Sequence, residues 1–320
     1  MEDNLNIEVL NREIIEAITD ADDGVIKSAS SAGSNMIRRR IREDGFSRNI
    51  LPPKAVTNDQ LDRVADHDRP VMIEDMEPES RGAKSIPFGD VADTEFYYGS
   101  KYVCSFNAIT TPEFTKDINE LRTYRMDLRR VITDNALRDI QAEEDFQFLS
   151  AVDAITGNMP VAAGGSSTGL SGAQQSFHFN KSGGNHFDRS DYVNVLSVLE
   201  DMNLNNGVFL MNRKTAKTFL TFNRDEIGGD LAQTLLTDGL TALQEAKIFG
   251  VKHLFTMKSD MVADNEMYLF AEPDYLGKFY TLQEPTMYVE KKKDILRFSA
   301  RETISVTFAN LAGVAKVNFT

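Results

Sequence analysis

The sequence predicts an α+β fold in which a compact α/β part is joined to an unusually long helix and to segments that extend away from it. Three observations predict this fold. Residues 113–156 contain neither Gly nor Pro and carry apolar residues at helical spacing. Helix and strand patterns alternate from 191 to 271, and period-two alternation marks strands from 279 to 319. The combination indicates a globular part with long projections.

The long helix has a start signal and a stop signal. Thr111-Pro112-Glu113 combines a capping hydroxyl, a proline at the first position and an acid favoured by the helix dipole. Thr156-Gly157 is a matching stop. A continuous helix over 112–156 would span roughly 65 Å. We expect one buried stripe and a wide polar face, because charges are dense at Arg122, Arg125, Asp127, Arg129, Arg130, Asp134, Arg138, Asp139, Glu143, Glu144 and Asp145.

The N-terminal 50 residues look helical but contain little apolar surface, and their charge is segregated. Residues 2–23 hold eight acids and one base, whereas residues 27–48 hold six bases and two acids. Four of those bases form the densest basic cluster, Arg38, Arg39, Arg40 and Arg42. The cluster is either a solvated helix face or a local contact with a polyanion or an acidic neighbour, and we favour the neighbour because the whole chain is acidic.

Residues 61–111 predict a long β-hairpin. Strand-like pieces at 71–73, 96–98 and 102–106 flank a charged, Gly- and Pro-bearing tip at 77–82. Little in this tip is apolar, so the hairpin would project into solvent or onto a neighbouring molecule.

The remaining chain alternates and then becomes β. We expect helices at 191–199, 214–222 and within 231–246, and strands at 207–211, 250–255 and 266–271. Short strands follow at 279–280, 287–289, 296–298, 304–308 and 315–319. Cys104 lies in an apolar run and is expected to be a small buried hydrophobe.

Composition excludes several functional classes. The 320-residue chain has 35 basic and 49 acidic residues, a net charge of −14, which disfavours nucleic-acid binding by overall charge. Its single Cys excludes an internal disulfide and a Cys-cluster zinc site. Neither a signal peptide nor an apolar run of about 20 residues is found, so we expect a soluble protein made in the cytosol without membrane contact.

No motif indicates catalysis. Residues 164–171 resemble a phosphate-binding loop, but Leu170 stands where the mechanism requires Lys, so a flexible loop is the better interpretation. A metal site at His178, His186, Asp188 and Asp191 is disfavoured because they lack helical spacing. The Gly-x-Ser-x-Gly elbow is absent. We therefore assign no catalytic, cofactor-binding or metal-binding residue and expect no enzyme and no cofactor.

The order of these elements resembles the major capsid proteins of tailed bacteriophages, which have the Hong Kong 97-type capsid fold. The resemblance covers essentially the entire chain and depends on order and spacing rather than on a catalytic signature. The matching stretches are Phe114-Thr115-Lys116-Asp117 through Leu121 and on to 134–139, then 248–252, 270–273 and 276–277, and finally 300–304 and 310–315.

The resemblance implies a role for each segment. It implies an N-terminal arm (1–60), an extended hairpin loop (61–111), a peripheral-domain spine helix (112–156), an axial domain (157–277), a peripheral-domain sheet (278–309) and an axial return strand (310–320). Subunits would assemble as pentamers and hexamers into an icosahedral head around double-stranded DNA, in the virion after assembly in the host cytoplasm. The candidate inter-subunit contacts are Arg38, Arg39, Arg40, Arg42, Arg69, Arg81 and Lys84.

Partners follow from the same resemblance. No cleavable scaffolding domain fits within 1–111, so we expect a separate scaffolding protein, a portal and, in some heads, a decoration protein, with weak local contact to packaged DNA. Some members of the family crosslink a hairpin Lys to an Asn, for which Lys84 or Lys101 and Asn310 are candidates, although a plain interfacial Lys is favoured. An encapsulin-like compartment shell is the alternative function, and a cytosolic α/β enzyme is the least favoured.

Overall fold

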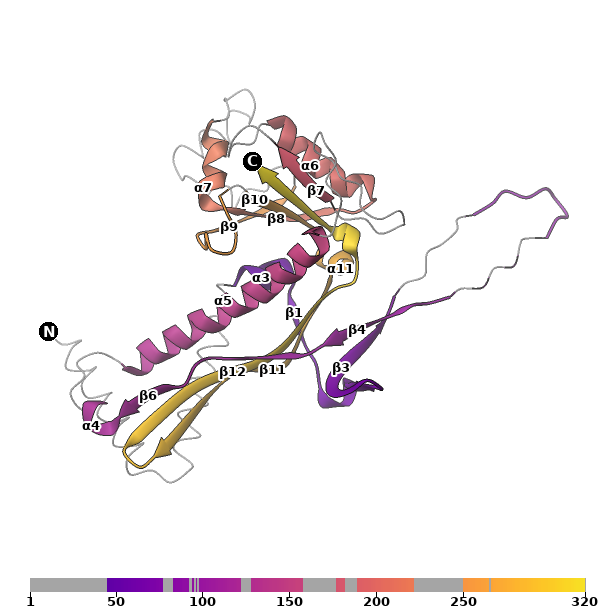
Figure 1. Ribbon diagram of the computed structural model, residues 1–320. Helices are drawn as coiled ribbons and strands as arrows, with labels where there is room; N and C mark the ends of the chain where they lie inside the picture. The colour runs from indigo at the N-terminus through magenta and orange to yellow at the C-terminus, as the bar shows by residue number, and fades with distance from the viewer. Residues whose placement is uncertain are drawn as a thin grey trace.

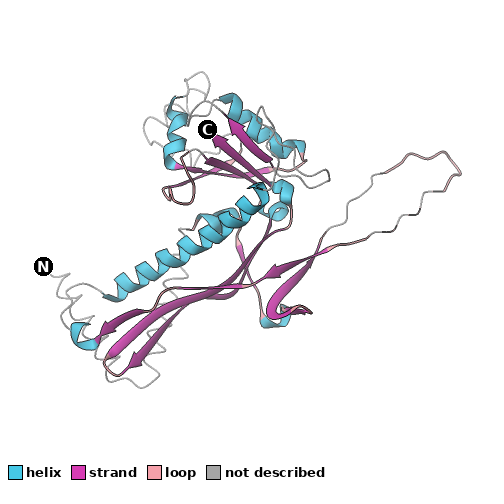
Figure 2. Ribbon diagram, in the orientation of Figure 1, coloured by secondary structure: helices cyan, strands magenta, loops and turns pink. Residues whose placement is uncertain are grey.

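A computed structural model describes residues 45–76, 83–91, 94, 96, 98–121, 128–157, 177–181, 189–221, 250–264 and 266–319. Figures 1 and 2 show an elongated molecule with a compact α/β part at one end, a long helix lying along a two-stranded ribbon, and a loop that projects far from both. The strands form three sheets. The α+β prediction is confirmed.

The first sheet is built on one long antiparallel hairpin. It has the order β1-β11-β12-β5, and β6 also pairs with β12. The strands are β1 (Pro53–Ala55), β5 (Asn107–Thr110), β6 (Phe114–Asp117), β11 (Gly277–Lys292) and β12 (Ile295–Phe308). The strands predicted at 279–280, 287–289, 296–298 and 304–308 are confirmed as strand residues, but the breaks predicted within each pair are wrong. They form two long strands, paired from Gly277 opposite Phe308 to Lys292 opposite Ile295.

An irregularity in this hairpin explains the error. The register shifts between Thr281 and Gln283 and again between Gln283 and Thr286. Glu284 and Pro285 therefore lie opposite the single residue Glu302, which is a β-bulge. A proline has no N–H for the ladder and is tolerated at such bulges. The bulge interrupts the period-two pattern in mid-strand, so each strand looks like two pieces in the sequence.

The long helix is α5 (Leu128–Gly157), which packs on this sheet. Residues 128–156 of the predicted helix are helical, but its predicted start at Thr111 is wrong. The residues after Gly157 lie outside the described part of the chain, so the predicted stop stays a prediction. Thr111 instead belongs to the sheet, because its N–H donates to the Ala300 carbonyl at 2.9 Å and its hydroxyl accepts from the Ala300 N–H at 2.9 Å. Strand β6 follows, and then the short helix α4 (Ile118–Leu121).

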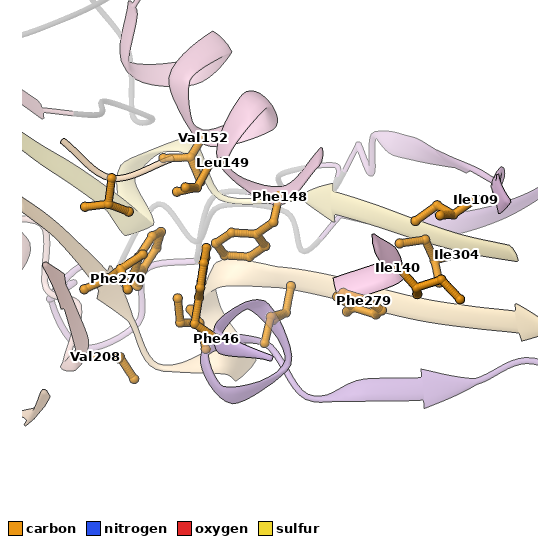
Figure 3. Close-up of a cluster of buried hydrophobic side chains, with 14 of the residues drawn as sticks. Phe46, Ile109, Ile140, Phe148, Leu149, Val152, Val208, Phe270, Phe279 and Ile304 are labelled. Atoms are coloured by element: carbon orange, nitrogen blue, oxygen red, sulfur yellow. The ribbon is translucent and has the colours of Figure 1, made fainter. Parts of the chain in front are cut away.

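The largest core among the described residues lies between α5, the first sheet, one face of the second sheet and the short helix α3 (Phe46–Ile50) (Figure 3). Phe148 of α5 is fully buried, with its ring centroid 5.6 Å from that of Phe270 and 5.3 Å from that of Phe308. Ile140, Leu149 and Val152 of α5 share this core, as Figure 3 shows. One face of α5 is therefore the apolar stripe that the sequence predicts.

The second sheet has the order β7-β13-β10-β8-β9. The strands are β7 (Phe177–Lys181), β8 (Asn206–Asn212), β9 (Lys252–Thr256), β10 (Glu266–Ala271) and β13 (Val314–Phe319). The helical elements are α6 (Arg189–Asp201), α7 (Arg213–Ala216), η2 (Lys217–Thr221), α11 (Pro273–Leu276) and η3 (Leu311–Gly313). The predictions of a helix at 191–199 and of strands at 207–211 and 266–271 are confirmed, whereas the helix predicted within 231–246 lies outside the described residues.

The third sheet, β2-β3-β4, carries the projecting loop. It comprises β2 (Asp62–Val64), β3 (His67–Asp75) and β4 (Lys101–Ser105), and the 3-10 turn η1 (Asn58–Gln60) precedes it. Cys104 of β4 is fully buried beside Val56, Phe106 and Tyr280, which joins this sheet to the first one. Burial raises the pKa of the Cys104 thiol, so the prediction of a buried hydrophobe is confirmed.

Candidate interaction surfaces

The projecting loop begins from a well-ordered base. Asp75 lies opposite Lys101 in the ladder, and the two side chains form an exposed ion pair at 3.6 Å. One residue further out, the Met76 N–H donates to the Ser100 carbonyl at 2.7 Å. Figure 1 shows the described stretch at residues 83–91 far from all labelled helices and strands. The strands at its base therefore set the direction of the loop.

The described part of the loop exposes large apolar side chains. Phe88 is 112 % exposed, Val91 86 %, Phe96 79 % and Tyr98 85 %, and Ile86 is also exposed. Apolar area of this kind on a surface marks a place where another molecule binds. Burying it would be favourable by about 25 cal/mol per Å². The loop is therefore a candidate contact surface.

This finding corrects the sequence interpretation of the hairpin. The tip at 77–82 lies outside the described residues, and the excursion extends to residue 100, well beyond that tip. Residues 96 and 98 are not in a strand, although a strand was predicted there. The sequence did contain a signal for this exposure. The apolar residues Ile86, Phe88 and Val91 lie beside the turn formers Pro87 and Gly89, which disfavour a strand that could bury them.

The structure places only two of the seven predicted contact residues. Arg69 is exposed on β3, and Lys84 is exposed on the loop. The other five lie outside the described residues: Arg38, Arg39, Arg40, Arg42 and Arg81. The contacts predicted for all seven residues stay predictions.

The candidates for a covalent crosslink have other contacts within the chain. Lys101 pairs with Asp75, as described above. The Asn310 side chain accepts a hydrogen bond from the Ala312 N–H at 3.0 Å, at the start of η3. Lys101 and Asn310 therefore each have a partner within the chain.

A buried cluster of charges lies between α3, α5 and β12. Arg48 of α3 donates from Nη2 to Glu144 Oε1 at 2.5 Å and from Nε to Glu144 Oε2 at 3.1 Å. The same Nη2 donates to Glu302 Oε1 of β12. The side chains of Glu144 and Glu302 are 0 % exposed and that of Arg48 is 7 % exposed. Two carboxyl groups therefore share one guanidinium out of contact with water.

This arrangement shifts the pKa values of its members. Burial, together with the charge of Glu144 and a hydrogen bond to it, raises the pKa of Glu302 to about 9, despite the opposing effect of Arg48. Burial acts to lower the pKa of Arg48, but its hydrogen bonds and charge interactions with Glu144 and Glu302 raise it overall. The preferred state is thus one cation, one carboxylate and one protonated carboxyl group.

Glu144 corrects the prediction of a wide polar face on the long helix. Its helical neighbours four residues away on either side, Ile140 and Phe148, are fully buried. The signal was therefore present, because residues four apart share one face of a helix. Its partners Arg48 and Glu302 are 96 and 158 residues distant (144 − 48 and 302 − 144), so no local pattern could identify them.

Two further charged contacts connect α5 with other elements. Asp145 accepts from Lys258 Nζ at 2.5 Å and from the Ser47 N–H at 3.1 Å. Near the end of the helix, Asp153 accepts from Lys316 Nζ of β13 at 2.7 Å. Burial raises the pKa of Asp145, against the lowering effect of Lys258. Helix α5 thus holds both the first and the second sheet.

His253 of β9 lies inside the second sheet's core. It is fully buried, with its ring stacked at 5.5 Å on Phe209 and its Nε2 atom 3.0 Å from the Tyr192 hydroxyl. Burial lowers the pKa of His253 to about 4. The neutral ring is therefore a packing element of the core.

The described ranges contain no group of three or more His, Cys, Asp or Glu side chains that could hold a metal ion. The disfavoured metal cluster around 178–191 and the Gly-rich stretch at 164–171 fall largely or wholly outside those ranges. Among the helices that the structure describes, none is long and apolar enough to cross a membrane.

Comparison with solved structures identifies similar folds, whereas no protein-family model and no curated protein matches the sequence. The chain is similar to the mature capsid of bacteriophage PhiM1, with 9 % identity over 87 % of each chain and a TM-score of 0.59. The capsid of cyanophage P-SCSP1u is 9 % identical over 85 % of this chain and 86 % of its own, with a TM-score of 0.57. A virus-like particle from Pyrococcus furiosus is 13 % identical over 92 % of this chain and 98 % of its own, with a TM-score of 0.52.

The similarity extends over most of each chain, so it concerns the whole architecture rather than one motif. At 9–13 % identity it establishes the fold. The predicted Hong Kong 97-type capsid fold is therefore confirmed.

Proposed function

We propose that this chain is the major capsid protein of a tailed bacteriophage, a structural protein that assembles into pentamers and hexamers of an icosahedral head. The observation that carries the proposal is the likeness to phage capsid subunits over more than four-fifths of the chain. In this role the protein is not an enzyme, and it is located in the virion after assembly in the host cytoplasm.

The projecting loop supports assembly on physical grounds. Its exposed apolar side chains, Phe88, Val91, Phe96 and Tyr98, make no core of their own. The loop extends beyond the ladder of β3 and β4, and a neighbouring subunit that covers its apolar side chains would stabilise it. Many weak contacts of this kind, repeated around a closed shell, produce a stable assembly through avidity.

We propose the segment roles stated above for the folded chain. In support, β11 and β12 from 277–308 form the first sheet, whereas β13 from the last residues joins β10 and β8 in the second. The first sheet with α5 would be the peripheral domain, and the second sheet with α6 would be the axial domain. The spine helix begins later than proposed from the sequence, since strand β6 occupies 114–117.

The proposed partners are other copies of this chain, a separate scaffolding protein, a portal and a decoration protein on the outside. Packaged double-stranded DNA would touch the shell only locally, because a net charge of −14 repels a polyanion over most of the surface. The basic cluster at Arg38–Arg42 is the proposed place for such a contact or for an acidic neighbour.

The direct test is to express the full chain with and without the other head proteins and to measure particle mass by light scattering. We expect mega-dalton particles, and electron microscopy of the co-expressed sample should show closed heads with one portal vertex and DNA. A monomer or small oligomer under every condition would exclude the capsid proposal and favour an enzyme. Well-formed empty shells in high yield from the chain alone would contradict the separate scaffolding protein.

An encapsulin-like compartment shell is the second candidate. The likeness to the Pyrococcus furiosus virus-like particle, at a TM-score of 0.52, favours it specifically, although the two phage capsids score higher. Small closed shells that hold protein and no DNA would decide for this candidate.

A further inference from the structure

We propose that the cluster Arg48–Glu144–Glu302 is a proton-dependent latch that holds helix α3 against α5 and β12 while one proton is bound, and that alkaline pH releases α3. The three side chains come from three separate elements and meet through the hydrogen bonds of one guanidinium. Helix α3 contributes Arg48 to this cluster. The state of the cluster therefore bears directly on the docking of α3.

Charge counting requires the proton. Two ionised carboxylates and one guanidinium would leave a net charge of −1 among side chains that are 0–7 % exposed. An uncompensated charge in such a place is strongly unfavourable, so the group takes up a proton instead. The Glu302 Oε2 atom supports this state, because it has no hydrogen-bond partner among the described residues unless a proton is present on one of the two carboxyl groups.

Among the residues that the structure describes, no other cation is placed to compensate the charge. The charged groups that act on Glu302 are Glu144 and Arg48. Strand β5 places Ile109 opposite it, and β11 places Glu284 of the bulge opposite it. The adjacent acid of α5, Asp145, already has Lys258. Strand β4 approaches β12 at Thr307, five residues further along.

Loss of the proton has a defined mechanical consequence. The pKa of Glu302 is raised to about 9 from its ordinary 4.5, so the folded chain keeps a proton that the unfolded chain loses. Docking of α3 therefore weakens as pH rises through this range. Above it, both carboxylates repel each other, and separation of α3 from α5 lets water reach them.

Trypsin reports release at the latch itself, because it cleaves after Arg48 only when α3 is undocked. The experiment uses the unassembled full-length chain between pH 7 and 9.5. The initial rate of cleavage at Arg48–Asn49 is divided by that at the exposed Lys84–Ser85 bond, which cancels the pH dependence of the protease. We expect the ratio to rise at least tenfold in the wild type and to change less than twofold in Glu302→Gln, which mimics the protonated state.

Glu143→Gln is the matched control, because Glu143 is the exposed neighbour of Glu144 on α5, and it should behave as the wild type. Far-UV circular dichroism verifies folding, and Glu144→Gln replaces Glu302→Gln if the latter does not fold. A wild-type ratio that stays constant from pH 7 to 9.5 would overturn the latch, as would an equal rise in a folded Gln variant. The measurement needs no assembly, so it is independent of the proposed capsid function.

Discussion

Replacing two aromatic side chains of the projecting loop should abolish assembly without affecting the fold of the subunit. The double variant Phe88→Ser/Phe96→Ser is the sharpest choice, since both rings are largely exposed, at 112 % and 79 %. Neither belongs to a buried cluster of the described chain. The free energy of unfolding of the subunit should therefore change by less than about 0.5 kcal/mol.

The effect on assembly follows from the area that a neighbour would cover. An aromatic ring buries roughly 150–250 Å², which at about 25 cal/mol per Å² gives an upper bound of about 4–6 kcal/mol. Truncation of a central interface residue costs about 2 kcal/mol in practice. Two such losses weaken each inter-subunit contact by about 4 kcal/mol, or roughly a thousandfold in its equilibrium constant.

Sedimentation velocity over a range of concentrations measures the fraction of chain in shells. The experiment is done with whichever head proteins the wild type needs. Met257→Ser is the matched control, because Met257 is 75 % exposed but lies after β9, far from the loop in the sequence. Assembly of the double variant at the wild-type concentration would refute the role of the loop, and a lowered unfolding midpoint would show that the rings stabilise the subunit itself.

Three further predictions concern stability, measured by urea unfolding of the unassembled chain with circular dichroism, since the chain has no Trp. The pKa of His253 is lowered from 6.5 to about 4, so as pH falls the unfolded chain takes up a proton before the folded chain does. The free energy of unfolding should therefore fall by about 3 kcal/mol between pH 6.5 and pH 4 and then level off. His253→Phe should remove this pH dependence. Arg48→Met should cost about 3–5 kcal/mol by leaving buried carboxyl groups without a cation, whereas Lys101→Met, in an exposed pair, should cost less than about 1 kcal/mol. Gly277→Ala should cost about 1–3 kcal/mol because its Cβ would clash with the Thr307 carbonyl oxygen. Gly99→Ala meets nothing within 4 Å and should change stability by less than about 0.5 kcal/mol. Equal effects within the Arg48 and Lys101 pair, or within the Gly277 and Gly99 pair, would contradict the reasoning.

Local sequence patterns predict an element well when the residues of that element determine its structure. The buried strand β8 was predictable because an apolar run is a property of neighbouring residues. The start of the long helix was not, because Thr111 has a good capping sequence but hydrogen-bonds to Ala300, 189 residues away. Pairing with a distant strand therefore determined the structure at Thr111, rather than the local capping sequence.

The candidate site was predictable only in outline. Its position, a hairpin that projects from the body, follows from the turn residues and the short strands around them. Its chemistry does not, because exposure of Phe88 or Phe96 depends on the absence of a strand partner that the pattern of 96–98 wrongly implied. The buried Glu144 and Glu302 were equally hidden, since each looks like a surface acid until Arg48 is placed between them.

The buried charge cluster and the exposed loop belong to two parts of the molecule, which differ in how far they depend on a neighbouring chain. As far as the structure describes it, the body is complete in one chain: buried clusters and the ion pairs of α5 join its elements, and even its buried acids lie against a cation. The loop is not, because its apolar surface remains exposed and its base is held by one exposed ion pair and the ladder of β3 and β4. Assembly would therefore change the free energy of the loop far more than that of the body. Substitutions in the loop should then act on the shell, whereas substitutions at α5 should act on the subunit before any shell forms.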